Sequence, residues 1–196
     1  MNISRSLLFA IATSFVLLPA QNASAQRRNS GFSQDWANVV RQRLPEYGHR
    51  NWIVIADSAY PAQSREGIET IVANADQITV LRTVLGMIKS SRHVRPTIYT
   101  DKELPYVLES EAPGVLQYRR SLTSELSGLN AQSLEHEKII SKLDETAKTF
   151  RVLIVKTDLA IPYTSVFIQL DCAYWSDESQ KRLSEEMAKG TGGTPE

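Results

Sequence analysis

The chain has 196 residues, in which 22 lysine and arginine residues balance 22 aspartate and glutamate residues, and 42% of all residues are hydrophobic. This length suits one domain with its own core, and zero formal net charge excludes the basic surface of a dedicated nucleic-acid-binding protein. A single cysteine excludes a disulfide scaffold and a cysteine-rich metal cluster. The averages nevertheless combine two unlike parts of the chain.

The first 25 residues have the features of an export signal. Arg5 supplies a positive charge, residues 7–20 are almost wholly apolar, and the segment ends in Ala23-Ser24-Ala25. A charged start, a short apolar middle and a small-residue end predict a secretory signal peptide that is cut after Ala25; a retained N-terminal anchor is the alternative. The apolar run is shorter than the roughly 20 residues that a spanning helix needs. We therefore expect a periplasmic or secreted protein without membrane contact after cleavage.

Helices and strands alternate along the remaining chain. We expect a flexible leader over residues 26–32, one α/β domain over 33–187 and a disordered, glycine-rich tail over 188–196. The spacing of apolar residues predicts helices over 33–44, 77–90, 133–149 and 176–187, with short helical or irregular pieces at 102–108 and 113–122. Short apolar runs predict strands at 52–56, 70–73, 96–100, 151–156 and 166–170. This alternation is typical of a single layered α/β domain with a largely parallel sheet flanked by helices.

Two segments place reactive side chains at strand ends, where ligands collect in open α/β sheets. In the first segment, His49 precedes the predicted strand 52–56 and Asp57 follows it. In the second, a loop between two apolar strands contains Tyr163 and Ser165. An imidazole that titrates near neutrality can act as a general acid or base, and a fixed carboxylate can hold a hydroxyl group. Taken alone, His49 also suits a capping position and Asp57 a turn.

Residues 47–62, YGHRNWIVIADSAYPA, resemble the opening motif of the D-ribose pyranase / L-fucose mutarotase (RbsD/FucU) family. That motif has a Gly-His pair, a spacer, an apolar strand, an Ala-Asp pair and a proline. Residues 152–169, with Pro162-Tyr163 before an apolar strand, resemble the family's second sugar-contacting loop. The resemblance implies an RbsD-like α/β fold and ring-shaped homo-oligomers with sites near subunit interfaces. It also implies cofactor-free interconversion of monosaccharide ring forms or anomers.

The resemblance implies a role for each matched residue. His49 matches the family's catalytic acid/base histidine, Asp57 its sugar-binding aspartate, and Tyr163 the tyrosine of the late loop. Ser165 stands where the family usually has asparagine, which removes an amide that both donates and accepts hydrogen bonds. His136, on the predicted helix 133–149, is the candidate for a second site histidine that some members have.

The residues suit anomeric exchange, in which one proton leaves the anomeric hydroxyl and another reaches the ring oxygen. An acid/base group and hydroxyl-orienting groups suffice without metal or cofactor, and His49, Asp57 and His136 lack the close spacing of metal ligands. The hypothesis is therefore an exported mutarotase or pyranase whose partner is a free monosaccharide, not a nucleic acid. Two alternatives stay open: a non-catalytic sugar-binding module of the same fold, suggested by Ser165 and the export signal, and an oligomeric scaffold with a degenerate pocket.

Overall fold

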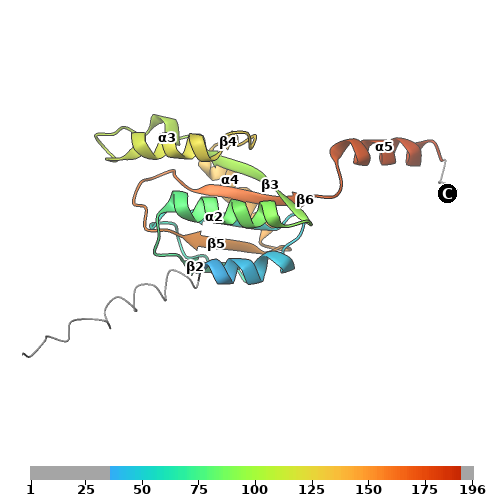
Figure 1. Ribbon diagram of the computed structural model, residues 1–196, viewed down its shortest axis with the longest axis horizontal. Helices are drawn as coiled ribbons and strands as arrows, with labels where there is room; N and C mark the ends of the chain where they lie inside the picture. Colours follow the sequence, from blue (N-terminus) through green and yellow to red (C-terminus); the bar gives the residue numbers. More distant parts are fainter. Residues whose placement is uncertain (1–35, 191–196) are drawn as a thin grey trace, which may run out of the picture.

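The computed structural model describes residues 36–190, in which six strands form one mixed sheet between layers of helices (Figure 1). Its order is β2-β5-β1-β6-β3-β4, and the strands are β1 (Trp52–Ala56), β2 (Ile68–Val72), β3 (Val94–Asp101), β4 (Gln132–Leu134), β5 (Val152–Lys156) and β6 (Val166–Cys172). β6 is antiparallel to its neighbours β1 and β3, and the other pairs are parallel. Five of these six strands thus run in one direction, which confirms the predicted α/β fold with a largely parallel sheet flanked by helices.

Helices cover both faces of the sheet, and this explains why the central strands are continuous apolar runs. Ile53 and Ile55 of β1 belong to a core formed with α2 (Gln77–Ser90), α3 (Val115–Glu125) and the helical residues 36–43. The alternate residues, Trp52, Val54 and Ala56, belong to a second core beneath α4 (His136–Thr146). Two short 3-10 helices, η1 (Leu44–Glu46) and η2 (Leu104–Tyr106), complete the helical layers.

The region predicted as one helix over 133–149 is instead a strand followed by a shorter helix. β4 pairs with the end of β3, with Leu134 opposite Asp101, and α4 begins only at His136. The Leu134 carbonyl also accepts a hydrogen bond from the Lys102 N–H at 2.8 Å. This pairing is a tertiary contact, and such contacts override the helical pattern of a short segment. The consequence is that His136 lies at the start of α4, near the end of β3.

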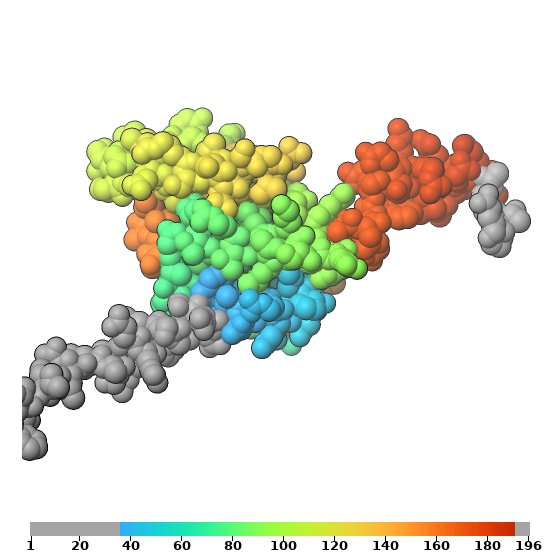
Figure 2. Space-filling view, viewed as in Figure 1, coloured from blue at the N-terminus to red at the C-terminus, as the bar shows by residue number. Residues whose placement is uncertain are grey.

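The C-terminal helix α5 (Asp177–Ala188) projects away from the sheet, as Figures 1 and 2 show. Its bounds agree closely with the predicted helix 176–187. None of its residues is buried. Within residues 36–190, no helix combines the length and apolar character required to cross a bilayer. The predicted signal peptide (1–25), the leader (26–32) and the last six tail residues lie outside the described residues.

Candidate functional site

Four separate chain segments bring polar side chains to one end of the sheet. Asp57 follows β1, Asp101 is the last residue of β3, and His136 follows β4 closely. β6 runs in the opposite direction and begins at the same end, with Val166 opposite both Ile55 and Thr100. The residues that precede β6, among them Tyr163 and Ser165, therefore reach the end at which the parallel strands finish. We call this the carboxyl end of the sheet, and the opposite one the amino end.

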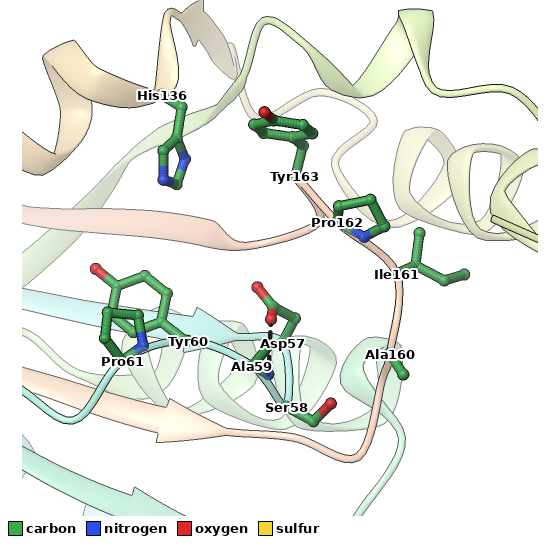
Figure 3. A pocket seen from close by; sticks show the side chains of 10 residues that line it. All are labelled: Asp57, Ser58, Ala59, Tyr60, Pro61, His136, Ala160, Ile161, Pro162 and Tyr163. Carbon is green, nitrogen blue, oxygen red and sulfur yellow. Dashed lines mark hydrogen bonds between the residues drawn. The ribbon is translucent and has the colours of Figure 1, made fainter. Parts of the chain in front are cut away.

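A cavity of about 400 Å³ opens at the carboxyl end, lined by residues 57–61, residues 160–163 and His136 (Figure 3). Its volume lies within the range of small-molecule sites. His136 and Tyr163 face each other edge to face, with ring centroids 5.6 Å apart and an interplanar angle of 84°. In Figure 3, Asp57 and Tyr60 lie across the cavity from these two rings. The cavity thus combines a carboxylate, an imidazole and phenol rings with proline and aliphatic walls.

The Asp57 carboxylate is held through both of its oxygens. Oδ1 accepts a hydrogen bond from the Ala59 N–H at 2.9 Å, and Oδ2 accepts one from the Ser165 hydroxyl at 3.1 Å. Ser165 is only 2% exposed and does not line the cavity. In this chain Ser165 therefore acts on the site through Asp57. Each carboxylate oxygen keeps a lone pair that can accept a hydrogen bond from a ligand hydroxyl.

His136 is held by two acidic residues. Its Nδ1 lies 3.0 Å from Oδ1 of Asp101, whose side chain is completely buried. Its backbone N–H donates to both carboxylate oxygens of Glu103, at 3.1 and 3.2 Å. Burial raises the pKa of Asp101 to about 6, although the hydrogen bond with His136 acts in the opposite direction. The sequence interpretation missed Asp101; its only signal is an acidic residue just beyond the predicted strand 96–100.

Tyr163 has a strained backbone at the rim of the cavity. Its φ of 58° lies in the left-handed region, which costs a residue other than glycine roughly 1–2 kcal/mol. Tyr163 is nevertheless 40% exposed, so the ring is not held by burial in a core. Strained residues of this kind cluster at ligand sites, where the surrounding structure maintains them. The conformation directs the Tyr163 ring toward His136 (Figure 3).

His49 lies at the other end of the sheet. It precedes β1 at the amino end, and its Nε2 is 3.4 Å from Oδ1 of Asp171, near the end of β6. Since an extended strand rises about 3.3 Å per residue, the four steps from Trp52 to Ala56 alone span about 13 Å. The structure therefore brings Asp57, Ser165, His136 and Tyr163 together, and it places His49 of the same chain far from them.

A cation organises the surroundings of His49. Arg95 donates to Oδ2 of Asp171 through Nε at 2.9 Å and through a terminal nitrogen at 2.7 Å. Partial burial alone would raise the pKa of Asp171, but the bonds from Arg95 hold it below its ordinary value. The ionised Asp171 carboxylate thus provides a fixed acceptor for the His49 ring. Across residues 36–190, no cluster of three or more His, Cys, Asp or Glu side chains is arranged to hold a metal ion.

Several solved structures are similar to this chain. They include Bacillus subtilis RbsD complexed with D-ribose, with 18% identity and a TM-score of 0.47, covering 65% of this chain and 87% of that one. FucU from Bifidobacterium longum has 19% identity and a TM-score of 0.44, covering 65% and 89%. The fucose mutarotase in complex with L-fucose from Streptococcus pneumoniae has 19% identity and a TM-score of 0.43, covering 65% and 87%. A search of curated proteins finds no match.

The sequence also matches a protein-family model over most of its length. The model describes the RbsD / FucU transport protein family and matches residues 37–172. The matched range runs from the first described helix to the last residue of β6. It therefore includes both ends of the sheet, with the cavity residues at one and His49 at the other. On this match, the chain belongs to the RbsD / FucU transport protein family.

Proposed function

We propose that this chain is a monosaccharide mutarotase or pyranase that binds a free sugar in the cavity at the carboxyl end of the sheet. The observation that carries the proposal is the convergence of Asp57, His136 and Tyr163 on a cavity of about 400 Å³ in a member of the RbsD / FucU family. Asp57 and Tyr163 offer groups that hydrogen-bond to sugar hydroxyls, and Ser165 fixes Asp57. The exposed ring of Tyr163 offers an apolar face to the sugar ring.

The reaction requires proton transfers and the reversible cleavage of one C–O bond of the sugar ring. The bond between the anomeric carbon and the ring oxygen breaks, a carbonyl forms at the anomeric carbon, and the ring closes again on the other face or through another hydroxyl. One proton leaves the anomeric hydroxyl for a base while an acid gives one to the ring oxygen, so no proton is gained or lost overall. Acid–base assistance typically contributes about 10²–10⁴-fold, which is useful for a step that already proceeds slowly in water.

We propose that His49 supplies acid/base catalysis to the cavity of a second copy of the chain. Within one chain, His49 lies at the amino end of the sheet and the cavity at the carboxyl end. A head-to-tail contact places these two ends of neighbouring copies against each other, and repetition of such a contact closes into a ring when the rotation allows. Asp171, held by Arg95, would then orient the imidazole that enters the neighbouring cavity.

The test is saturation-transfer NMR of anomeric exchange with ribose, fucose, galactose and glucose. Wild-type protein should accelerate exchange of at least one of these sugars, and His49→Ala and Asp57→Ala should each remove the acceleration. His93→Gln is the matched control, because His93 has a structural role away from the cavity. Its Nε2 lies 3.1 Å from the Leu44 carbonyl oxygen and 3.0 Å from that of Tyr47. Absence of acceleration with every sugar, or full acceleration by His49→Ala, would contradict the catalytic proposal.

A sugar-binding module without catalysis is the second candidate. Ser165 favours it, because it stands where the family usually has asparagine and its hydroxyl is bonded to Asp57 instead of lining the cavity. A sugar-dependent rise in melting temperature without exchange would support the binding module. If the sugars neither stabilise the protein nor exchange faster, the scaffold hypothesis is the one left.

We also propose that the protein is exported to the periplasm or outside the cell. The proposal rests on the sequence of residues 1–25, with its charged start, apolar middle and Ala-Ser-Ala end. N-terminal sequencing of the native protein should give Gln26 as the first residue. An intact Met1 on the native protein would refute cleavage.

A further inference from the structure

Asp101 is a buried carboxyl group that the chemistry above does not use. Its side chain has no exposed surface, Oδ1 is bonded to His136, and Oδ2 has no hydrogen-bond partner among the described residues. A buried carboxylate without compensation is costly, so a single partner matters greatly to it. The side chain of His136 is 30% exposed and reaches the cavity. Asp101 is thus connected to the candidate site through this one ring.

The geometry of the pair determines which nitrogen of His136 carries the proton. A neutral imidazole has one N–H donor and one acceptor nitrogen, and an ionised carboxylate can only accept. Where Asp101 is ionised and the ring is neutral, the Nδ1 that lies 3.0 Å from Asp101 must hold the proton, and Nε2 keeps its lone pair. The Glu103 contacts with the backbone N–H and the edge contact with Tyr163 restrict the rest of the residue. Figure 3 shows the ring directed into the space above Tyr60 and Asp57.

We propose that Asp101 is a positioning residue that holds His136 in the Nδ1–H tautomer and so makes Nε2 an acceptor for a sugar hydroxyl. This inference rests on the proposed function, because it assigns the ligand of the same cavity. Asp57 and His136 would then present two fixed acceptors on opposite sides of the cavity. A sugar that fits would place a hydroxyl donor toward each of them.

The tautomer can be measured directly by ¹⁵N NMR of the imidazole rings in the full chain at mildly alkaline pH. His136 should show a pyrrole-type Nδ1 and a pyridine-type Nε2. His93 is an internal reference with the opposite expectation, because its Nε2 lies near two carbonyl oxygens and must carry the proton. His136→Gln and His93→Gln assign the two signals. An Nε2–H tautomer for His136 in the wild-type protein would overturn the proposal.

Two variants separate Asp101 from its acidic neighbour. Asp101→Leu preserves the approximate shape of the side chain and removes the acceptor, so the His136 signal should move toward the Nε2–H form. Glu103→Gln changes a carboxylate that touches only the backbone of His136, and it should preserve the Nδ1–H form. A His136 signal in Asp101→Leu that is identical to the wild-type signal would exclude Asp101 as the cause of the tautomer.

Exchange kinetics then test what the tautomer does. Carboxylates that support metal-bound histidines change activity by about 10–100-fold, and the same geometry supports His136, so kcat/KM of Asp101→Leu should fall at least about tenfold with the sugar that wild type exchanges fastest. If wild type exchanges no sugar, the proposed function fails while the NMR result still decides the tautomer. If wild type exchanges a sugar and Asp101→Leu, with its altered tautomer, keeps the same kcat/KM, the positioning role fails alone.

Discussion

Among single residues, two polar side chains that line the cavity, Asp57 and His136, are each fixed by a neighbour behind them. Asp57 is held by Ser165, and His136 is held by Asp101. Both supporting residues are 2% exposed, so neither offers a ligand appreciable surface. Such support keeps reacting groups in place without the cost of ordering them when a ligand arrives. Substitution of a supporting residue should therefore alter the site without removing any group that faces the cavity.

The strained backbone of Tyr163 gives a prediction in which stability and function separate. Tyr163→Gly relieves the left-handed conformation, so the free energy of unfolding should stay the same or rise by about 1 kcal/mol. Loss of the ring should nevertheless lower kcat/KM for sugar exchange at least about tenfold. Urea unfolding and saturation-transfer NMR measure the two effects.

The control for this prediction is Asn74→Gly. Asn74 also has a positive φ, of 47°, but it does not line the cavity. The Asn74→Gly variant should be as stable as Tyr163→Gly and should keep full exchange activity. Full activity of Tyr163→Gly, or a loss of more than about 2 kcal/mol of stability in it, would contradict the view that this strain serves the site.

Asp101 should make stability fall as the pH rises through the weakly acidic range. Its pKa is about 6 in the folded protein against 3.8 ordinarily, so between these values the folded state holds a proton that the unfolded state has lost. The free energy of unfolding then decreases by up to about 1.4 kcal/mol per pH unit, and by about 3 kcal/mol in all once the pH exceeds the folded pKa. The groups that influence this titration are His136, Glu103 and Asp57.

The measurement is the difference between the unfolding free energies of wild type and Asp101→Asn, taken by urea denaturation at several pH values. The other carboxyl groups are common to both proteins, so the difference isolates Asp101. Relative to the variant, wild type should lose stability between about pH 4 and pH 6 and not beyond. A difference that does not vary with pH would show that Asp101 titrates normally.

What the sequence could predict about the site follows from how local each signal is. Asp57 and Tyr163 lie in motifs of continuous sequence, and the structure brings both to the cavity. No local motif reveals Asp101, because its role depends on His136, which lies 35 positions away in the sequence. The positions of His49 and Asp57 on either side of β1 already imply opposite ends of the sheet, although the sequence interpretation treated them as one segment.

At the scale of elements, one buried amide connects three parts of the fold behind the cavity. Gln77, at the start of α2, donates from Nε2 to the Tyr118 hydroxyl at 2.9 Å and to the Thr164 carbonyl at 2.5 Å. Its Oε1 accepts from the Thr157 hydroxyl at 3.1 Å. α2, α3 and the segment between β5 and β6 therefore meet at this side chain, and that segment contains Tyr163 and Ser165.

Replacement of Gln77 by leucine should both destabilise the protein and disturb the site. Loss of these buried bonds should cost about 2–4 kcal/mol, and the freed segment should lower the rate of sugar exchange. Arg82→Ala, on the same helix, is the control, because the Arg82 side chain is 64% exposed in its ion pair with Glu125, and such solvent-screened pairs contribute about 1 kcal/mol or less. Equal costs for the two variants in urea unfolding would rule out a special role for the Gln77 network.

The elements that could be predicted differ physically from those that could not. β1 and β5 are apolar because both faces of the sheet are covered, so composition alone reveals them. β4 is three residues long and depends on its pairing with β3, which leaves no local pattern. The reversed direction of β6 is likewise set by the path of the preceding segment, and it is this reversal that carries Tyr163 and Ser165 to the cavity.

At the scale of the whole molecule, the sheet has a histidine–aspartate pair at each end. His136 and Asp101 lie at the carboxyl end, and His49 and Asp171 lie at the amino end. Ring opening of a sugar needs one group to take a proton and another to give one. In one isolated chain the sheet separates the two imidazoles, whereas the proposed head-to-tail assembly would bring them together at every contact. The proposed reaction therefore requires that the amino end of one copy contacts the carboxyl end of the next.

Mixing two inactive variants tests whether each site is shared between two copies. If each site takes His49 from one copy and Asp57 from the next, then His49→Ala and Asp57→Ala are inactive separately, and some contacts in a mixed assembly join an intact His49 to an intact Asp57. Random assembly of equal amounts should restore about a quarter of the wild-type sites, because each of the two intact residues is present with a probability of one half.

The two variants are co-expressed with different tags, purified through both tags and assayed by saturation-transfer NMR. Sites contained within one chain would leave the mixed assembly as inactive as its components. The double variant His49→Ala/Asp57→Ala, mixed with wild type, controls for dilution, since it contributes no intact residue of either kind.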